Sequence, residues 1–263
     1  WANSAHSVII VTLLPIFFDT VAGYTADSVS SMSTWGYATS IAMLIVALAA
    51  PFLGVFGDIR GMRKKLFSFF MLLGVAACAG MAFTPGMDFT SGPVAAGKVA
   101  SLILVLYIVS VIGFDASAIY YDAFLTDVTI EDRMDKVSTM GYGLGYIGGS
   151  TIPLLIFLIM NLVGVPMLTC LAFVFGLTAV WWLAFSLPLL KNCEQTSGKP
   201  YEKGDVARSI KGVGTTIKEI IANKPMLIYI LSYFFYIDGV HTVISMATTY
   251  GTNLGLDSTG MML

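Results

Sequence analysis

The chain has 263 residues, of which 57% are hydrophobic and only 11% are charged. Together with a mean hydropathy of +0.83, this composition excludes an ordinary soluble domain, in which about a quarter of the residues are charged, and indicates an integral membrane protein. The formal net charge of −2 identifies no partner, and nothing in the sequence suggests nucleic-acid binding. The cysteines Cys78, Cys170 and Cys193 show neither metal-ligand nor disulfide spacing, so we expect no metal and no cofactor.

Apolar runs predict seven membrane spans. Each run approaches the roughly 20 residues that cross a hydrocarbon core. We expect helices, because only helices and closed barrels satisfy their backbone in lipid and these runs are too long for barrel strands. The expected spans are residues 3–22, 35–56, 66–83, 99–125, 139–163, 166–190 and 225–250.

Basic residues orient these spans. The loops after the second, fourth and sixth spans hold thirteen of the fourteen lysines and arginines, and only Lys98 falls on the other side. Lys and Arg bias short loops towards the cytosol. We therefore expect a multi-pass plasma-membrane protein with its N-terminus in the cytosol. The most charged short loop, residues 54–65 (GVFGDIRGMRKK), predicts a hairpin on the cytosolic face.

Small residues open the fifth span. Gly141, Gly145 and Gly149 fall four apart on one helical face. Small residues at this spacing allow another helix to approach closely. We expect tight helix packing here, and a helix that slides during transport would use the same surface.

A long loop separates the sixth span from the seventh. Its first part, residues 192–204, is polar, contains glycine and proline, and predicts a flexible linker. Its second part predicts an amphipathic helix on the cytosolic membrane surface. A solvated linker is the alternative, because Gly212 and Gly214 weaken any helix. The apolar residues spaced by three and four are Val206, Ile210, Val213, Ile217 and Ile221.

These features divide the chain into three parts. We expect a six-helix transmembrane bundle over residues 1–190, a cytosolic linker over residues 191–224 and the incomplete start of a second bundle over residues 225–263. The chain begins at Trp1 without a methionine and stops at Leu263 soon after a span. We therefore expect a piece of a longer protein, with the missing C-terminal half as a partner.

Ionisable residues inside the spans are the candidates for function, since each costs roughly 2.5–3.5 kcal/mol to insert. All of them fall on the first, fourth and seventh spans. Asp115 and Asp238 lie near span midpoints, where substrate and coupling-ion sites usually lie, whereas Asp19 lies towards the outside and Asp122 towards the cytosol. The five candidates are Asp19, Asp115, Asp122, Asp238 and His241.

Two chemical roles fit the midpoint acids. Burial favours the protonated form of an aspartate, so Asp115 and Asp238 are candidates to bind and release a proton that His241 relays or shares. Alternatively, the carboxylates receive the amino group of a substrate. A structural role, with hydroxyl partners on other helices, is the competing interpretation for this pair. A structural or gating role is the stronger one for Asp122, and exposure to external water is the alternative for Asp19.

The hairpin resembles the loop 2–3 signature of the major facilitator superfamily: Gly, three residues, Asp, two residues, Gly, one residue and two bases. The matching residues are Gly54, Asp58, Gly61, Arg63 and Lys64. Further segments resemble the bacterial "unknown major facilitator" family, which is related to the fungal vacuole effluxers. These segments are WANSAHS, FDASAIYYDAFLTDV, VSTMGYGLGYIGG and YFFYIDGVHTVISMATTYGTNLGL.

The sequence departs from the family pattern at four positions. His6 and His241 stand where an aromatic residue and an amide are expected, and Asp122 and Thr126 stand where Asn and Pro are expected. These departures put a shared substrate in doubt. We expect His6 to lie near the membrane interface. The fifth span also lacks the Gly-Pro pair of the antiporter motif, so antiport does not carry over.

The resemblance implies an all-α major facilitator fold in which the first, fourth and seventh spans line a central cavity. It implies a secondary transporter that moves a small polar solute through the lipid bilayer by alternating access, with export, amino-acid substrates and proton coupling as further expectations. Asp58 would gate the cytosolic side against the second half. The alternative is a non-transporting receptor or assembly factor with the linker as its binding part. An enzyme is not expected, because the sequence shows no nucleophile, phosphate or metal motif.

Overall fold

The structure is a computed structural model that describes residues 1–25, 31–198, 200 and 205–256. Throughout this part of the chain every regular element is a helix. Seven segments are long and apolar enough to cross a membrane, which confirms the expected number of spans and the fold class. They are Ser4–Ala22, Ser31–Gly57, Arg63–Gly86, Pro93–Val128, Glu131–Leu162, Met167–Asn192 and Lys224–Gly251.

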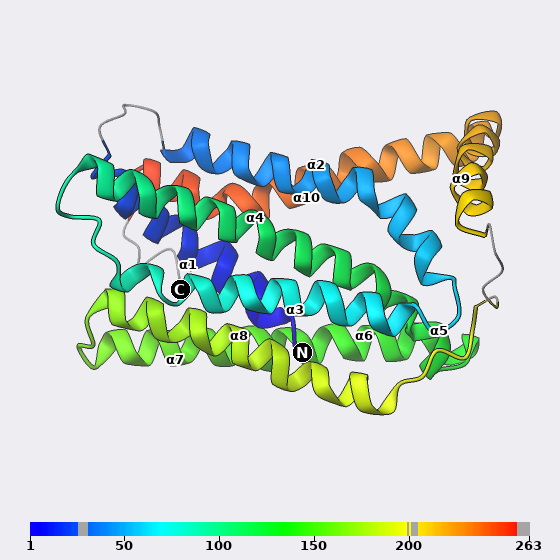
Figure 1. Cartoon of the computed structure of the whole chain (residues 1–263), viewed down its shortest axis with the longest axis horizontal. Coiled ribbons are helices and arrows are strands. Elements are labelled where there is room, and N and C mark those ends of the chain that lie inside the picture. Colours follow the sequence, from blue (N-terminus) through cyan, green and yellow to red (C-terminus); the bar gives the residue numbers. More distant parts are fainter. Residues whose placement is uncertain (26–30, 199, 201–204, 257–263) are drawn as a thin grey trace.

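The elements follow one another as long helices joined by short turns (Figure 1). The first four spans comprise α1 (Ser4–Ala22), α2 (Ser31–Gly57), α3 (Arg63–Met81) with η1 (Thr84–Gly86), and α4 (Pro93–Ala123) with α5 (Leu125–Val128). The others comprise η2 (Glu131–Arg133), α6 (Met134–Leu144), η3 (Gly145–Ser150), α7 (Thr151–Leu162), α8 (Met167–Asn192), α9 (Asp205–Ala222) and α10 (Lys224–Asn253).

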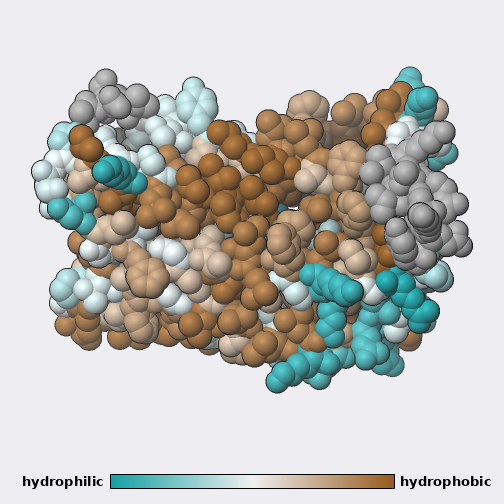
Figure 2. Space-filling view, viewed as in Figure 1, coloured by the Kyte–Doolittle hydropathy of each residue, from teal (hydrophilic) through white to brown (hydrophobic). Residues whose placement is uncertain are grey.

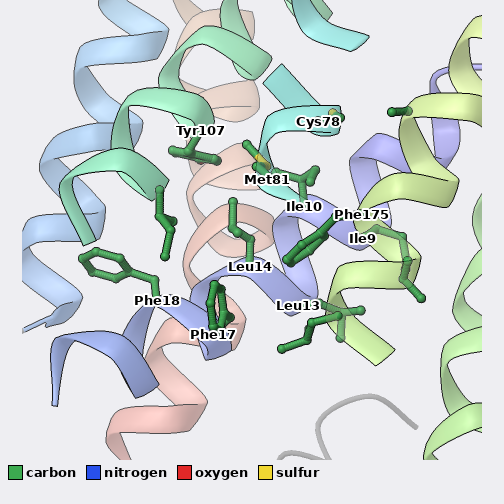
Figure 3. Close-up of a cluster of buried hydrophobic side chains, with 14 of the residues drawn as sticks. Ile9, Ile10, Leu13, Leu14, Phe17, Phe18, Cys78, Met81, Tyr107 and Phe175 are labelled. Atoms are coloured by element: carbon green, nitrogen blue, oxygen red, sulfur yellow. The ribbon is translucent and has the colours of Figure 1, made fainter. Parts of the chain in front are cut away.

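The bundle is built around α1, most of whose apolar side chains are buried. Leu13 and Phe17 of α1 pack into one cluster with Met81 of α3, Tyr107 of α4 and Phe175 of α8 (Figure 3). Outside this cluster the middle of the molecule is covered by apolar side chains, and hydrophilic ones gather towards its ends (Figure 2). An apolar belt around a packed core is what a bundle exposed to lipid requires.

Two glycines allow α3 and α4 to cross closely. A Cβ atom added to Gly113 would lie 2.5 Å from the backbone nitrogen of Gly74, and one added to Gly74 would lie 2.4 Å from the ring of Trp182 on α8. No side chain larger than hydrogen fits between the helices at these points. Gly74 and Gly113 therefore fix the packing of three helices.

The fifth span differs from the expected single helix over residues 139–163. It begins at Glu131, and a π-helical turn, η3, divides α6 from α7. The residues added at its start include Glu131, Asp132 and Asp135, which the apolar pattern left outside the span. Acidic residues suit this position, because a helix N-terminus has a partial positive charge.

Helices α9 and α10 complete the described chain. Helix α10 packs beside α1 and α2, and α9 contacts α2 and α10 where it lies across their ends (Figure 1). We call this the hairpin end, because the turn between α2 and α3 lies there as well. Ile217 and Ile221 of α9 are exposed.

Candidate functional site

Polar side chains of α2, α4 and α10 interact with one another in the bundle. Asp115, half-buried on α4, interacts electrostatically with His241 on α10 and with Tyr107, two turns earlier on its own helix. The Tyr107 hydroxyl lies 3.0 Å from Thr39 Oγ1 of α2. Three helices that are distant in sequence thus contribute a carboxylate, an imidazole and two hydroxyls, spread over about two turns of α4.

The predicted stripe on α10 divides into two environments. Asp238 and His241 are exposed, whereas Ser245 is buried and donates a hydrogen bond to the His241 carbonyl at 2.7 Å. Asp238 forms no hydrogen bond or ion pair with the residues that the structure describes. The structure therefore places His241, and not Asp238, opposite Asp115.

Asp122 lies on α4, nearer the hairpin end, among phenol rings. It is exposed and interacts electrostatically with Tyr121 and with Tyr142 of α6. Tyr142 in turn interacts electrostatically with Tyr233 of α10. Asp122 is thus linked to α10 through Tyr142 of α6, whereas Asp115 interacts with His241 of α10 itself.

Positive side chains are scarce along these helices. Lys98 and Lys224, close to the starts of α4 and α10, are the only lysines or arginines in the sequences of α1, α2, α4 and α10. The acids in the interiors of these spans therefore have no lysine or arginine near them along the same helices.

Helices α1, α2 and α10 come together around Asp19 at the end of the bundle opposite the hairpin. This carboxylate accepts a hydrogen bond from the Ser31 hydroxyl at the start of α2. Asp19, Ser31 and Trp35 line a narrow gap with Thr249 of α10 that leaves no room for a water molecule. Helices α1, α2 and α10 thus leave no water-sized space between them at this point, whereas Tyr233 nearer the hairpin end is exposed.

The signature hairpin forms a tight turn between α2 and α3. Gly61 has a φ of +81°, a conformation that only glycine adopts without strain. Lys64 Nζ donates a hydrogen bond to the carbonyl of Cys193 at 3.1 Å. A Cβ atom on Gly54 would meet nothing within 4 Å. The Asp58 side chain is exposed and forms no hydrogen bond with the described residues.

Arg63 is the buried member of the signature, and its partner Asp127 was missed from the sequence. Arg63 Nη1 lies 2.5 Å from Asp127 Oδ2, and the Asp127 side chain has no exposed surface. The same nitrogen donates to the Ala123 carbonyl at 3.0 Å, and the guanidinium lies 5.7 Å from the centre of the Phe124 ring. One feature of the sequence could have predicted this pair. Asp127 is an acid at the end of the fourth span, and that end lies on the same membrane face as the basic hairpin.

The first residues after α8 differ from the flexible linker that we expected over residues 192–204. Residues 194–198, here called the strap, lie against the hairpin and Asp127. The Gln195, Thr196 and Ser197 side chains supply hydrogen bonds that replace contact with water. Residues 199 and 201–204 lie outside the described part.

The three predicted glycines of span five do not share one environment. A Cβ atom on Gly145 would lie 2.8 Å from Ser4 Oγ, and one on Gly149 would lie 2.3 Å from the Trp1 carbonyl oxygen, so both face α1. Gly141 has only the Tyr121 hydroxyl nearby, at 3.9 Å. The π turn over Gly145–Ser150 interrupts the four-residue repeat. It also presses Gly148, which was not predicted, against the Trp1 ring.

His6 lies in the core and not at the membrane interface. It is 3% exposed, its Nε2 lies 3.2 Å from Ser110 Oγ, and its ring stacks on Phe114 at a centroid distance of 4.7 Å. Its Nδ1 is buried without a partner among the described residues. Figure 1 explains the difference, because the N-terminus lies part-way along the bundle and not at the hairpin end.

Comparison with known proteins identifies the family. The model of the family described as "Vacuole effluxer Atg22 like" matches residues 19–262. The chain belongs to this family. Among curated relatives, the Atg22-like chain is 38% identical to the "Uncharacterized MFS-type transporter YxiO" of Bacillus subtilis (strain 168) over 271 aligned residues. This alignment covers the whole chain but 60% of the relative's length.

Fungal proteins extend the relationship. The Atg22-like chain is 26% identical to "Autophagy-related protein 22-1" of Penicillium rubens over 48% of its own length and 23% of the relative's. A protein of the same name from Sclerotinia sclerotiorum is 26% identical over 44% of the chain and 22% of the relative. No solved structure matches the chain. The resemblance that the hairpin and span motifs indicated is thereby confirmed.

Proposed function

We propose that this multi-pass membrane chain forms the N-terminal part of a secondary active transporter that moves a small polar solute by alternating access. The Atg22-like family and the similarity to an MFS-type transporter support transport as the activity. The observation that carries the proposal for the site is the electrostatic interaction of Asp115 on α4 with His241 on α10. It joins the six-helix bundle to the seventh span.

The proposed chemistry follows from the acidic residues within the spans, which have no lysine or arginine near them along the same helices. An aspartate at bilayer depth is stabilised when a proton or a cationic group neutralises it. In the coupled mechanism Asp115 takes up a proton on one side of the membrane and releases it on the other, and His241 holds or passes that proton. In the recognition mechanism Asp115 binds the amino group of the solute. Asp122 and Asp238 lie along the path by which the solute would reach it. An amino acid meets this requirement.

The direction of entry is also a proposal. The described helices leave no water-sized space beside Asp19, whereas Asp122, Asp238 and His241 are exposed. A solute would therefore reach Asp115 from the hairpin end. Because basic residues concentrate on that side, we propose that it faces the cytosol, together with the N-terminus, in a plasma membrane. The membership in a family of vacuole effluxers supports export as the direction that we propose.

The test is flux through the full-length protein in proteoliposomes, measured for a set of amino acids with and without a proton gradient. We expect flux that Asp115→Asn reduces by at least about tenfold, because removing a charge partner inside a span removes more than about 1.4 kcal/mol of interaction. Asp88→Asn, in the exposed turn before α4, is the matched control.

Two outcomes would contradict the proposal. The absence of flux for every solute of the set would favour a non-transporting role. Unchanged flux in both Asp115→Asn and His241→Gln would remove these residues from the mechanism.

A further inference from the structure

The Gln195 side chain of the strap forms hydrogen bonds with both ends of the hairpin turn. Gln195 Nε2 donates to the Gly57 carbonyl at 3.0 Å, and its Oε1 accepts hydrogen bonds from the backbone nitrogens of Gly61 at 2.8 Å and Arg63 at 3.3 Å. Helix ends leave carbonyls and amides without intrahelical partners. The amide of Gln195 therefore satisfies the end of α2 and the start of α3 together.

A second anchor joins the strap to α5. Asp127 Oδ1 accepts hydrogen bonds from the backbone nitrogens of Thr196 at 3.1 Å and Ser197 at 2.9 Å. It also accepts bonds from the Thr196 hydroxyl at 2.9 Å and the Ser197 hydroxyl at 2.7 Å. Arg63 binds the other oxygen of Asp127 and donates to Ser197 Oγ at 3.1 Å. One buried carboxylate thus connects the strap, the hairpin and the end of the fourth span.

The strap ends directly against the backbone of the signature acid. Gly198 has a φ of +112°, and a Cβ atom there would lie 2.8 Å from the Asp58 carbonyl oxygen and 2.9 Å from Gln195 Nε2. Only glycine permits both this conformation and this approach. The Asp58 backbone is consequently fixed by the strap while its carboxylate stays exposed.

We propose that Gln195 and Ser197 are positioning residues of the cytosolic gate, which hold the hairpin turn so that the Asp58 carboxylate is presented in one orientation to the second half of the protein. This inference rests on the proposed transport function and on a gating role for Asp58. The contacts described above join parts of one bundle: α2, α3, α5 and the segment after α8. None of them has to break when two halves of a transporter move as rigid bodies.

The first measurement needs no transport. Hydrogen–deuterium exchange of residues 57–65 is followed in the full-length protein and its variants. We expect exchange about tenfold faster in Gln195→Ala, because the Gly61 amide loses its acceptor and the Gly57 carbonyl its donor. Gln195→Glu keeps the acceptor and loses the donor, so its exchange should be intermediate. Glu194→Ala, an exposed neighbour in the strap, is the control.

The second measurement is solute flux. We expect Gln195→Ala and Gly198→Ala to lower the maximal rate about five- to tenfold with an unchanged half-saturation constant, since the gate and not the solute site is disturbed. Ser197→Ala should act in the same direction, and Ser197→Thr, which keeps the hydroxyl, should restore the rate. A role in folding alone would lower the amount of protein and would not produce this pattern.

The outcomes are distinguishable. Unchanged exchange in Gln195→Ala would overturn the inference, as would faster exchange with an unchanged maximal rate, or a raised half-saturation constant. The absence of flux in the unmodified protein would instead overturn the proposed function on which the inference rests.

Discussion

Asp127 and Arg63 form a buried ion pair at the hairpin end of the bundle, with 2.5 Å between Arg63 Nη1 and Asp127 Oδ2 and 5% and 0% of the two side chains exposed. The pair links α3 to α5, and it depends on the strap because the second carboxylate oxygen is occupied by Thr196 and Ser197. Asp127 is therefore the residue at which the basic signature, the fourth span and the linker meet.

Asp127→Asn should destabilise the protein. Removing one partner of a buried ion pair leaves the other charge uncompensated, which costs up to about 3–5 kcal/mol. We expect a lower midpoint of thermal unfolding in detergent and faster proteolysis after residue 198. Asp132→Asn, at an exposed position in η2, should leave both unchanged. An equal midpoint for the two variants would contradict the structural importance of the pair.

Gly113→Ala should separate α3 from α4. The added methyl group would lie 2.5 Å from the Gly74 nitrogen, and overpacking of this kind costs about 1–3 kcal/mol. Gly97→Ala on the same helix meets nothing within 4 Å, so it should stabilise the helix slightly, by up to about 1 kcal/mol. Thermal unfolding of the two variants side by side is the measurement. If both behave alike, the close crossing of the helices is wrong.

Asp58→Asn should slow transport and leave solute affinity nearly unchanged. The Asp58 carboxylate is exposed at the hairpin turn, away from Asp115, and by resemblance it meets the second half of the transporter when the cytosolic side closes. Initial rates of flux over a range of solute concentrations separate the two parameters. A large rise in the half-saturation constant would argue against gating.

His6→Phe should be tolerated. A phenyl ring keeps the stacking on Phe114 and removes the buried Nδ1 that lacks a partner. Ser110 Oγ retains its bond to the Tyr107 carbonyl at 2.9 Å. We expect stability within about 1 kcal/mol of the unmodified protein, whereas His6→Ala should lose about 2–4 kcal/mol by leaving a cavity. Loss of flux in His6→Phe with normal stability would instead reveal a role for the imidazole in proton transfer.

The sequence allowed the spans and the family to be predicted, because apolar runs and the loop signature are local patterns. It also made Asp115 and His241 candidates, since an ionisable residue in an apolar run is visible without a structure. The sequence did not show which residue of the seventh span interacts with Asp115. In the structure this residue is His241, which lies one turn from Asp238 on the same helix. Such a small rotation of α10 depends on packing that no single span encodes.

The contacts at the hairpin end escaped prediction for a different reason. Gln195 reaches Gly61 across 134 positions of the sequence, and Thr196 reaches Asp127 across 69. Polar residues after a span look the same whether water or another segment satisfies them. The interruption of the glycine repeat could not be predicted either, because the sequence of residues 145–150 does not distinguish a π-helical turn from an α-helical one.

The anchored strap also limits how far from the hairpin the start of α9 can lie. Its last described contact is at Gly198, and α9 begins at Asp205. A chain of seven residue steps spans at most about 25 Å when fully extended. The start of α9 is therefore tethered within about that radius of Gly198, which lies against the Asp58 backbone, for as long as Gln195 and Asp127 hold the strap.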